Sequence, residues 1–196
     1  DGCRQGVMAS NITGTGKVNG ETSAKKRPEM LPCDIFRFTN GGEKWIACVG
    51  IMDGRPYEIF TGKAESLQVP NSVNDGVIIK VKKKGENSRY DLRYVDCDGY
   101  HVTIEGINRM FDPEFWNYGK FLSAVLRHGM GIQYIVEMLN TLSFENDSIN
   151  SWRAGVVRSL KKWIKDGTKS SDKCPNCGNE LTYENGCKTC HYCGYS

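Results

Sequence analysis

The positions of the apolar residues divide the chain into three regions with different patterns. From residue 34 to about residue 106, apolar residues tend to recur at every second position, which is typical of β-strands. From residue 112 to residue 164 they recur every three to four positions, as on one face of a helix. Residues 174–196 show neither period and contain five cysteines. The sequence therefore predicts a sheet, then helices, then a small cysteine-rich unit.

The first region predicts an antiparallel β-meander. Short turn signals separate its alternating segments, and Asp53-Gly54 and Asp98-Gly99 are typical of tight turns, where positive φ angles are needed. Strands joined by such turns run antiparallel, and their sheets commonly leave one face in water. The expected strands span residues 34–39, 44–52, 55–61, 77–81, 90–94 and 102–104.

The second region predicts three helices. Asp112-Pro113 marks the start of the first, because Asp is a good N-cap and Pro suits the first helical position. His128-Gly129 ends that helix. The sheet and the helices each have an apolar face that must be covered, so we expect them to pack together as an α+β domain. The other two helices are expected around residues 132–142 and 152–164.

These patterns define four parts of the chain. Residues 1–33 are expected to hold the end of an upstream segment and a flexible linker, because residues 11–26 are rich in Gly, Thr, Ser and Lys. The α+β domain is expected over residues 34–167. A second flexible linker at 168–173 then leads to a small zinc ribbon at 174–196.

Composition narrows the class of protein. The apolar fraction of 39% and the mean hydropathy of −0.49 fit a globular domain, and no apolar run is long enough to cross a bilayer. The net charge of +3 gives no strong attraction to nucleic acid or anionic membrane. Nine cysteines, an odd number that includes clustered pairs, favour a reducing compartment, so we expect a cytoplasmic protein. Cys48 and Cys97, in or next to strands, are expected in the core. No Ser-His-Asp arrangement or paired carboxylate site stands out.

The cysteine-rich tail has the spacing of a zinc site. It contains two Cys-x-x-Cys-Gly motifs, each of which lets two thiolates reach one ion from a tight turn. Twenty residues cannot bury a core of their own, so the metal would supply the folding energy. A redox dithiol pair without metal is the competing interpretation of each motif. The expected zinc ligands are Cys174, Cys177, Cys190 and Cys193.

A fifth cysteine leaves a choice of register. Cys187 lies three residues before Cys190, so these two could replace Cys190 and Cys193 as the second pair of ligands. That register lacks a Gly after its second cysteine, so we favour Cys190 and Cys193. Cys187 is then a thiol beside the metal, either redox-active or merely packed. His191 could also bind metal, but its place inside a motif favours exposure to solvent.

Several stretches resemble one family of enzymes. The opening DGCRQGVM resembles the segment that closes the catalytic barrel of class II, adenosylcobalamin-dependent ribonucleotide reductases. The ending CPNCGNELTYENGCKTCHYCGYS resembles their cysteine-rich tail. Three further stretches resemble their C-terminal domain of the type called TSCPD, although the pentapeptide of that name is absent: EKWIACVGIMDGRPYEIFTG, YGKFLSAVLRHGMGIQYIVEML and INSWRAGVVRSLKKWIKDGT.

The resemblance implies a role in DNA precursor synthesis. The parent enzyme would reduce ribonucleotides to deoxyribonucleotides with a cysteine radical in its barrel, which would also bind adenosylcobalamin. The tail would help to re-reduce the active-site disulfide with electrons from a thioredoxin-like donor. Independently of the resemblance, four cysteines satisfy the zinc and a fifth remains beside it, so we predict that Cys187 is the redox thiol of the tail. The implied partners are the barrel of the same polypeptide and that reductant. We expect the 196 residues alone to bind no adenosylcobalamin and to catalyse nothing.

Two other functions remain open. One is a nucleic-acid-binding or regulatory zinc ribbon, which should have a basic and aromatic surface. Residues 174–196 contain Lys188 as their only Lys or Arg, beside Glu180 and Glu184, which weakens that interpretation. The other is a purely structural zinc clip without a redox role.

Overall fold

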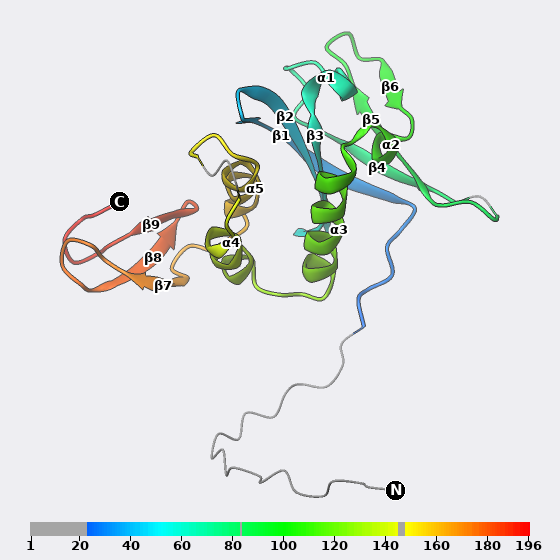
Figure 1. Cartoon of the computed structure of the whole chain (residues 1–196). Helices are drawn as coiled ribbons and strands as arrows, with labels where there is room; N and C mark the ends of the chain where they lie inside the picture. Colours follow the sequence, from blue (N-terminus) through cyan, green and yellow to red (C-terminus); the bar gives the residue numbers. More distant parts are fainter. Residues whose placement is uncertain (1–22, 83, 145–147) are drawn as a thin grey trace, which may run out of the picture.

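A six-stranded antiparallel sheet forms the main body of the protein (Figure 1). The structure is a computed structural model and describes residues 23–82, 84–144 and 148–196. The segment that resembles the end of a catalytic barrel therefore lies outside the described residues. The strands are β1 (Met30–Asn40), β2 (Glu43–Met52), β3 (Arg55–Lys63), β4 (Asp75–Val81), β5 (Arg89–Val95) and β6 (His101–Ile104).

The order of the strands differs from a simple meander. The sheet runs β3-β2-β1-β4-β5-β6, so the first strand of the chain lies in the middle. After β3 the chain returns across the sheet through the single turn α1 (Ala64–Leu67), and β4 then pairs with the free edge of β1. Two three-stranded antiparallel units thus share one sheet. The predicted turns are correct, but local alternation cannot show which edge a later strand will join.

Both faces of the sheet are covered around β2 and β3, so the expected single solvated face is wrong there. On β2, Trp45 and Val49 join the cluster beneath the long helices, while Ile46 and Cys48 join a cluster on the opposite face. Successive residues of β2 therefore point to two different apolar clusters, one on each face of the sheet, as expected for a strand that is buried on both sides. Cys48 is fully buried, as predicted.

The long helices pack on one face of the sheet and along the open edge of β3, where the Ser123 hydroxyl accepts a hydrogen bond from the backbone N–H of Ile59 (Figure 1). They are α3 (Pro113–Arg127), α4 (Ile132–Thr141) and α5 (Trp152–Lys161). Asp112 caps α3 by accepting a hydrogen bond from the backbone N–H of Glu114, and Pro113 occupies the first turn, as the sequence predicts. The short α2 (Ile107–Met110) contributes Ile107 to the cluster on the opposite face. The α+β fold is confirmed, with two single-turn helices in addition to the three expected.

The segment before β1 is fixed to the sheet over its last residues. Tyr57 donates a hydrogen bond from its hydroxyl to the carbonyl of Lys25, at 2.6 Å, and Arg27 forms an ion pair with buried Glu58. Strand β1 begins at Met30. The boundary of the body therefore lies several residues before the expected residue 34, because Arg27 has a buried partner that the local composition does not reveal.

The tail forms a second, three-stranded sheet beside α4 and α5 (Figure 1). Its strands are β7 (Lys169–Lys173), β8 (Glu180–Glu184) and β9 (Cys187–Thr189). Strand β7 corresponds to the expected flexible linker, which instead pairs with β8. The polar composition of β7 fits a linker, but its backbone forms hydrogen bonds with β8 of the ribbon.

One tyrosine joins the ribbon to the body. Tyr183 is fully buried and belongs to the same hydrophobic cluster as the helices. Its backbone carbonyl accepts a hydrogen bond from Gly167 and its N–H donates to the carbonyl of Thr168, both at 2.8 Å. The backbone N–H of Asn185 adds a bond to the Asp166 carboxylate at 2.7 Å. The ribbon is therefore packed against the body and is not a free tether.

A candidate metal centre in the ribbon

The four predicted ligands come together at one end of the ribbon. The sulfur atoms of Cys174, Cys177, Cys190 and Cys193 all lie within 4.8 Å of one another. Cys174 Sγ is 3.5 Å from Cys193 Sγ, and Cys177 Sγ is 3.5 Å from Cys190 Sγ. Four thiolates at about 2.3 Å from a tetrahedral zinc ion would be about 3.8 Å apart. The spacing of the cluster therefore suits one zinc ion.

The backbone of the first motif wraps around its own sulfur atoms. Gly178 donates its N–H to the carbonyl of Cys174 at 2.8 Å, which closes the turn between the two thiols. Cys174 in turn donates its N–H to the carbonyl of Asn179 at 2.8 Å. These bonds hold the thiols of Cys174 and Cys177 on the same side of the turn.

The second motif repeats this geometry. Gly194 donates to the carbonyl of Cys190 at 2.9 Å, and Cys190 donates to the carbonyl of Tyr195 at 2.7 Å. Gly178 and Gly194 also adopt the same left-handed conformation, with φ angles of 72° and 74°. The Gly at the end of each Cys-x-x-Cys-Gly motif is thus explained, because a side chain would strain the backbone there. The repeat in the sequence corresponds to a structural repeat of the site.

The cluster is half inside the ribbon and half at its surface. Cys174 and Cys190 are buried together with Leu181, while Cys177 and Cys193 are exposed. These three buried residues form the ribbon's own hydrophobic cluster, which is much smaller than the clusters of the body. An ion bound by the four sulfurs would therefore supply most of the internal contacts of the ribbon.

The electrostatics of the cluster favour a cation. Hydrogen bonds from the backbone and the side chain of Asn179 lower the pKa of Cys177 to about 6. The backbone N–H of Tyr195 lowers the pKa of Cys193, but hydrogen bonds with the neighbouring thiols and desolvation together outweigh it and raise that pKa to about 12. Four thiols this close cannot all ionise unless a positive charge lies among them. Zinc would supply that charge, and its binding would release thiol protons.

Cys187 lies outside the four-sulfur group. It is the first residue of β9, pairs in register with Glu184 and is exposed. The sulfurs that the structure brings together are thus those of the favoured register, in which Cys190 and Cys193 form the second pair. His191 is also exposed, as expected, with its Nε2 atom 3.3 Å from a carboxylate oxygen of Glu184. Cys97, expected in the core, is exposed instead, because it follows β5 in a turn.

A wide crevice beside the ribbon includes Cys187. Its volume is about 680 Å³, and it lies between the end of α5 and strands β7 and β9. Three lysines and one aspartate line it, and Lys188 pairs with that aspartate. The lining of the crevice therefore carries a net positive charge, while Glu184 lies opposite Cys187 in the sheet. The charged residues of the crevice are Lys161, Asp172, Lys173 and Lys188.

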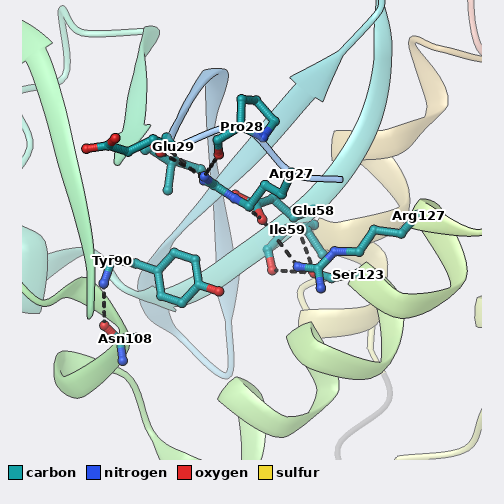
Figure 2. A network of polar contacts seen from close by, with 10 residues as sticks. Arg27, Pro28, Glu29, Glu58, Ile59, Tyr90, Asn108, Ser123 and Arg127 are labelled. Carbon is teal, nitrogen blue, oxygen red and sulfur yellow. Dashed lines mark hydrogen bonds and ion pairs between the residues drawn. The ribbon is translucent and has the colours of Figure 1, made fainter. Parts of the chain in front are cut away.

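The body contains a buried ionic network that the sequence analysis missed (Figure 2). Glu58 of β3 is fully buried, and Arg27 contacts both of its carboxylate oxygens at 2.6–3.1 Å. Arg127 of α3 lies 3.3 Å from the same carboxylate. The only sequence signal was an acidic residue between Tyr57 and Ile59 in the middle of β3. The network ties the segment before β1 to the sheet and to α3.

Comparison with known protein families identifies the body. A family model described as "NrdJ homologue C-terminal domain" matches residues 31–165. The chain belongs to this family. The match confirms the resemblance to a C-terminal domain related to ribonucleotide reductase. Searches of curated proteins and of solved structures found no match.

The NrdJ-homologue domain coincides with the sheet and its helices. The matched range runs from the second residue of β1 to just beyond α5 and ends before the ribbon. The four-cysteine cluster therefore lies outside the matched range. Among the helices of the described residues, none is long and apolar enough to cross a membrane. The class of reductase and its use of adenosylcobalamin stay predictions.

Proposed function

We propose that this chain is the C-terminal module of a ribonucleotide reductase and that its ribbon helps to re-reduce the active-site disulfide of that enzyme. The family match supports the first part of the proposal. The observation that carries the second part is the position of Cys187, an exposed thiol outside the four-sulfur cluster. Electrons would come from a thioredoxin-like donor. The parent reductase would be the class II type, with adenosylcobalamin bound by its catalytic barrel, and would act in the cytoplasm.

The exchange chemistry needs one accessible thiolate on the ribbon. The Cys187 thiolate would attack one sulfur of the active-site disulfide, forming a mixed disulfide and releasing the other sulfur as a thiolate that takes up a proton. A thiolate of the donor would then attack the Cys187 sulfur and release the second active-site thiol. The second thiol of the donor would free Cys187 and leave the donor oxidised to a disulfide. Two electrons thus pass from the donor dithiol to the active site.

The crevice around Cys187 supports this role. Lys161, Lys173 and Lys188 line this crevice and favour an acidic partner surface. The packing of Tyr183 limits how far the ribbon can travel while it is docked. Delivery of Cys187 to a distant disulfide would therefore require the ribbon to leave the body, or the disulfide to be presented next to it.

The test is the Cys187→Ser variant of the complete reductase. Turnover driven by a thioredoxin-like protein should fall at least tenfold, while turnover with a small dithiol that enters the active site directly should survive. Zinc content should be unchanged, since Cys187 is not among the four clustered sulfurs. The matched control is Cys97→Ser, which removes another exposed thiol from outside the ribbon and should alter neither activity. Unchanged thioredoxin-driven turnover would refute the relay.

A structural zinc clip is the second candidate, and the docking of Tyr183 favours it. In that role the metal would hold β7–β9 in shape so that Tyr183 completes the hydrophobic cluster of the helices. The same variant separates the two functions. A clip predicts that Cys187→Ser leaves thioredoxin-driven turnover intact, whereas loss of a zinc ligand lowers the stability of the whole module.

A further inference from the structure

A small cavity lies beside the buried ionic network, and Arg127 belongs to both. Its volume is about 290 Å³, and β3, β5 and α3 enclose it. Figure 2 shows Tyr90 on one side of this region and Ser123 and Arg127 on the other. The cavity has no place in the electron-relay proposal. Its lining combines three aromatic rings, Phe60, Tyr90 and Trp116, with the cations Lys120 and Arg127.

The cations at this cavity outnumber the carboxylates. Arg27 occupies both oxygens of Glu58 at 2.6–3.1 Å, so Arg127, at 3.3 Å, is only partly neutralised by the same carboxylate. The Nε atom of Arg127 is buried and has no hydrogen-bond partner among the described residues. The four charged groups Arg27, Glu58, Lys120 and Arg127 together carry an excess of two positive charges.

Two lysines lie over the aromatic rings instead of beside acids. Lys120 Nζ is 5.8 Å from the ring centre of Trp116, and Lys80 Nζ is 5.4 Å from that of Tyr90. Within the part of the chain that the structure describes, neither forms an ion pair. A cation on an aromatic ring is held in position yet keeps its hydrogen-bonding capacity. Both ammonium groups are thus available to an anionic ligand.

The aromatic rings form one continuous surface. Trp116 stacks on Phe60 with ring centres 5.5 Å apart, and Tyr90 contacts both rings at 5.1 and 6.1 Å. Trp116 and Tyr90 are only partly buried, so they still offer apolar area to a ligand. Ligand sites commonly combine such apolar walls with a few converging polar groups.

We propose that this cavity binds a small organic anion in which a planar ring carries a phosphate or a carboxylate. Arg127 and Lys120 contact the anionic group, and the Tyr90 hydroxyl donates a hydrogen bond to it. The ring of the ligand packs against Trp116 and Phe60. The volume of about 290 Å³ is near the lower end of known ligand cavities, which run from about 300 Å³ upward, so the ligand is a small molecule.

Isothermal titration calorimetry of the whole chain with phenyl phosphate tests the proposal, and benzoate distinguishes a phosphate site from a carboxylate site. Saturable binding of one molecule per chain is expected for at least one of the two compounds. Inorganic phosphate should bind at least tenfold more weakly than phenyl phosphate if phosphate is the preferred group, because it lacks the ring.

Variants locate the site. Lys120→Gln should weaken binding about tenfold, and Tyr90→Phe should weaken it severalfold without disturbing the fold, since it removes only a hydroxyl. The matched control is Lys162→Gln, which removes a lysine that lies 4.5 Å from the ring centre of Trp163 but does not line the cavity. Its affinity should be unchanged. The proposal is overturned if neither aromatic anion saturates the protein at millimolar concentrations, or if Lys162→Gln weakens binding as much as Lys120→Gln. It is also overturned if inorganic phosphate and an uncharged aromatic alcohol bind as well as the aromatic anions.

Discussion

The body and the ribbon of this protein are stabilised by different interactions. The body has two hydrophobic clusters, one on each face of its sheet. The ribbon buries Cys174, Leu181 and Cys190 as its own cluster, and its largest buried side chain, Tyr183, packs into the body. Burial of apolar area can stabilise the body, whereas the ribbon needs other interactions.

This difference indicates that a metal bound by the four sulfurs would support the ribbon at one end, while the body supports it through Tyr183. The four sulfurs hold the two Cys-x-x-Cys motifs at one end, and Tyr183 fixes the middle strand to the helices. The body, in turn, uses a ribbon residue to complete the cluster around α4 and α5. The two parts should therefore unfold separately but influence each other.

Removal of zinc should have the largest effect. Structural zinc sites contribute about 10–16 kcal/mol of apparent binding free energy at neutral pH, far more than the small ribbon cluster can replace. After chelation, the amide signals of residues 174–196 should collapse to random-coil positions in a heteronuclear NMR spectrum. The sheet and its helices should stay folded with a lower melting temperature, because Tyr183 then leaves their cluster.

Metal analysis of the untreated protein provides the reference, with one zinc per chain expected. Cys190→Ser should reproduce the effect of chelation, while Cys187→Ser should retain the metal, since only Cys190 belongs to the four-sulfur group. A ribbon that keeps its dispersed spectrum after zinc is shown to be gone would disprove the metal dependence. Loss of zinc in Cys187→Ser would instead show that the ligand register is wrong.

Within the body, the largest single effect should come from Glu58→Gln. Glu58 is fully buried, and its replacement leaves Arg27 without its negative partner; breaking a buried ion pair in this way costs about 3–5 kcal/mol. The free energy of unfolding, from urea denaturation, should fall by that amount while zinc affinity stays constant. The matched control is Glu43→Gln on the exposed Lys63–Glu43 pair, where the change should be within about 0.5 kcal/mol. Equal effects would contradict the assigned burial.

The strands and helices of the body were accessible from the sequence because they depend on local patterns. The alternation in β2 and the Asp112-Pro113 start of α3 both predict the observed elements. The central position of β1 was not accessible, because pairing with β4 depends on a crossover after β3 that leaves no local signal. Likewise, polar composition suggested a linker at β7, although backbone hydrogen bonds form with any side chain.

The clustering of the four cysteines was accessible because their spacing suffices to predict it. Two Cys-x-x-Cys-Gly motifs specify both the four clustered thiols and the turns that carry them. The ionic network around Glu58 was not accessible, since its members come from three distant segments. The docking of Tyr183 was missed for the same reason. A single tyrosine in a short polar strand does not by itself indicate that its side chain packs against another part of the chain.

Tyr183→Ala should undock the ribbon without disturbing the metal. Truncation of a buried aromatic residue commonly costs about 3–5 kcal/mol, and we expect about 3 kcal/mol here because the ribbon can move away and let the site close. The body should lose that stability, and hydrogen exchange should show weaker protection in α4 and α5. Zinc content should stay at one ion per chain. Loss of the metal from this variant would mean that docking and metal binding form a single cooperative unit.

The smallest effect should come from substitution of the glycines that end the two Cys-x-x-Cys-Gly motifs. These substitutions test whether the two motifs contribute equally to zinc affinity. Gly178 has a φ angle of 72°, and open space surrounds the position where a Cβ atom would lie, so an alanine there meets only backbone strain. A left-handed conformation costs an alanine about 1–2 kcal/mol. The ribbon needs that conformation when zinc is bound, so Gly178→Ala should lower zinc affinity about tenfold in competition with a chelating dye.

Two further alanine variants complete this test. Gly194→Ala should have the same effect as Gly178→Ala, because the two positions share their φ angle, their open surroundings and their hydrogen bond to the first cysteine of the motif. Gly99→Ala introduces a comparable strain at φ 85° in the turn before β6, in the body. It should lower the melting temperature of the body and leave zinc affinity unchanged. If Gly99→Ala weakens zinc binding as much as Gly178→Ala does, then strain in the body reaches the metal, and the body and ribbon fold as one unit.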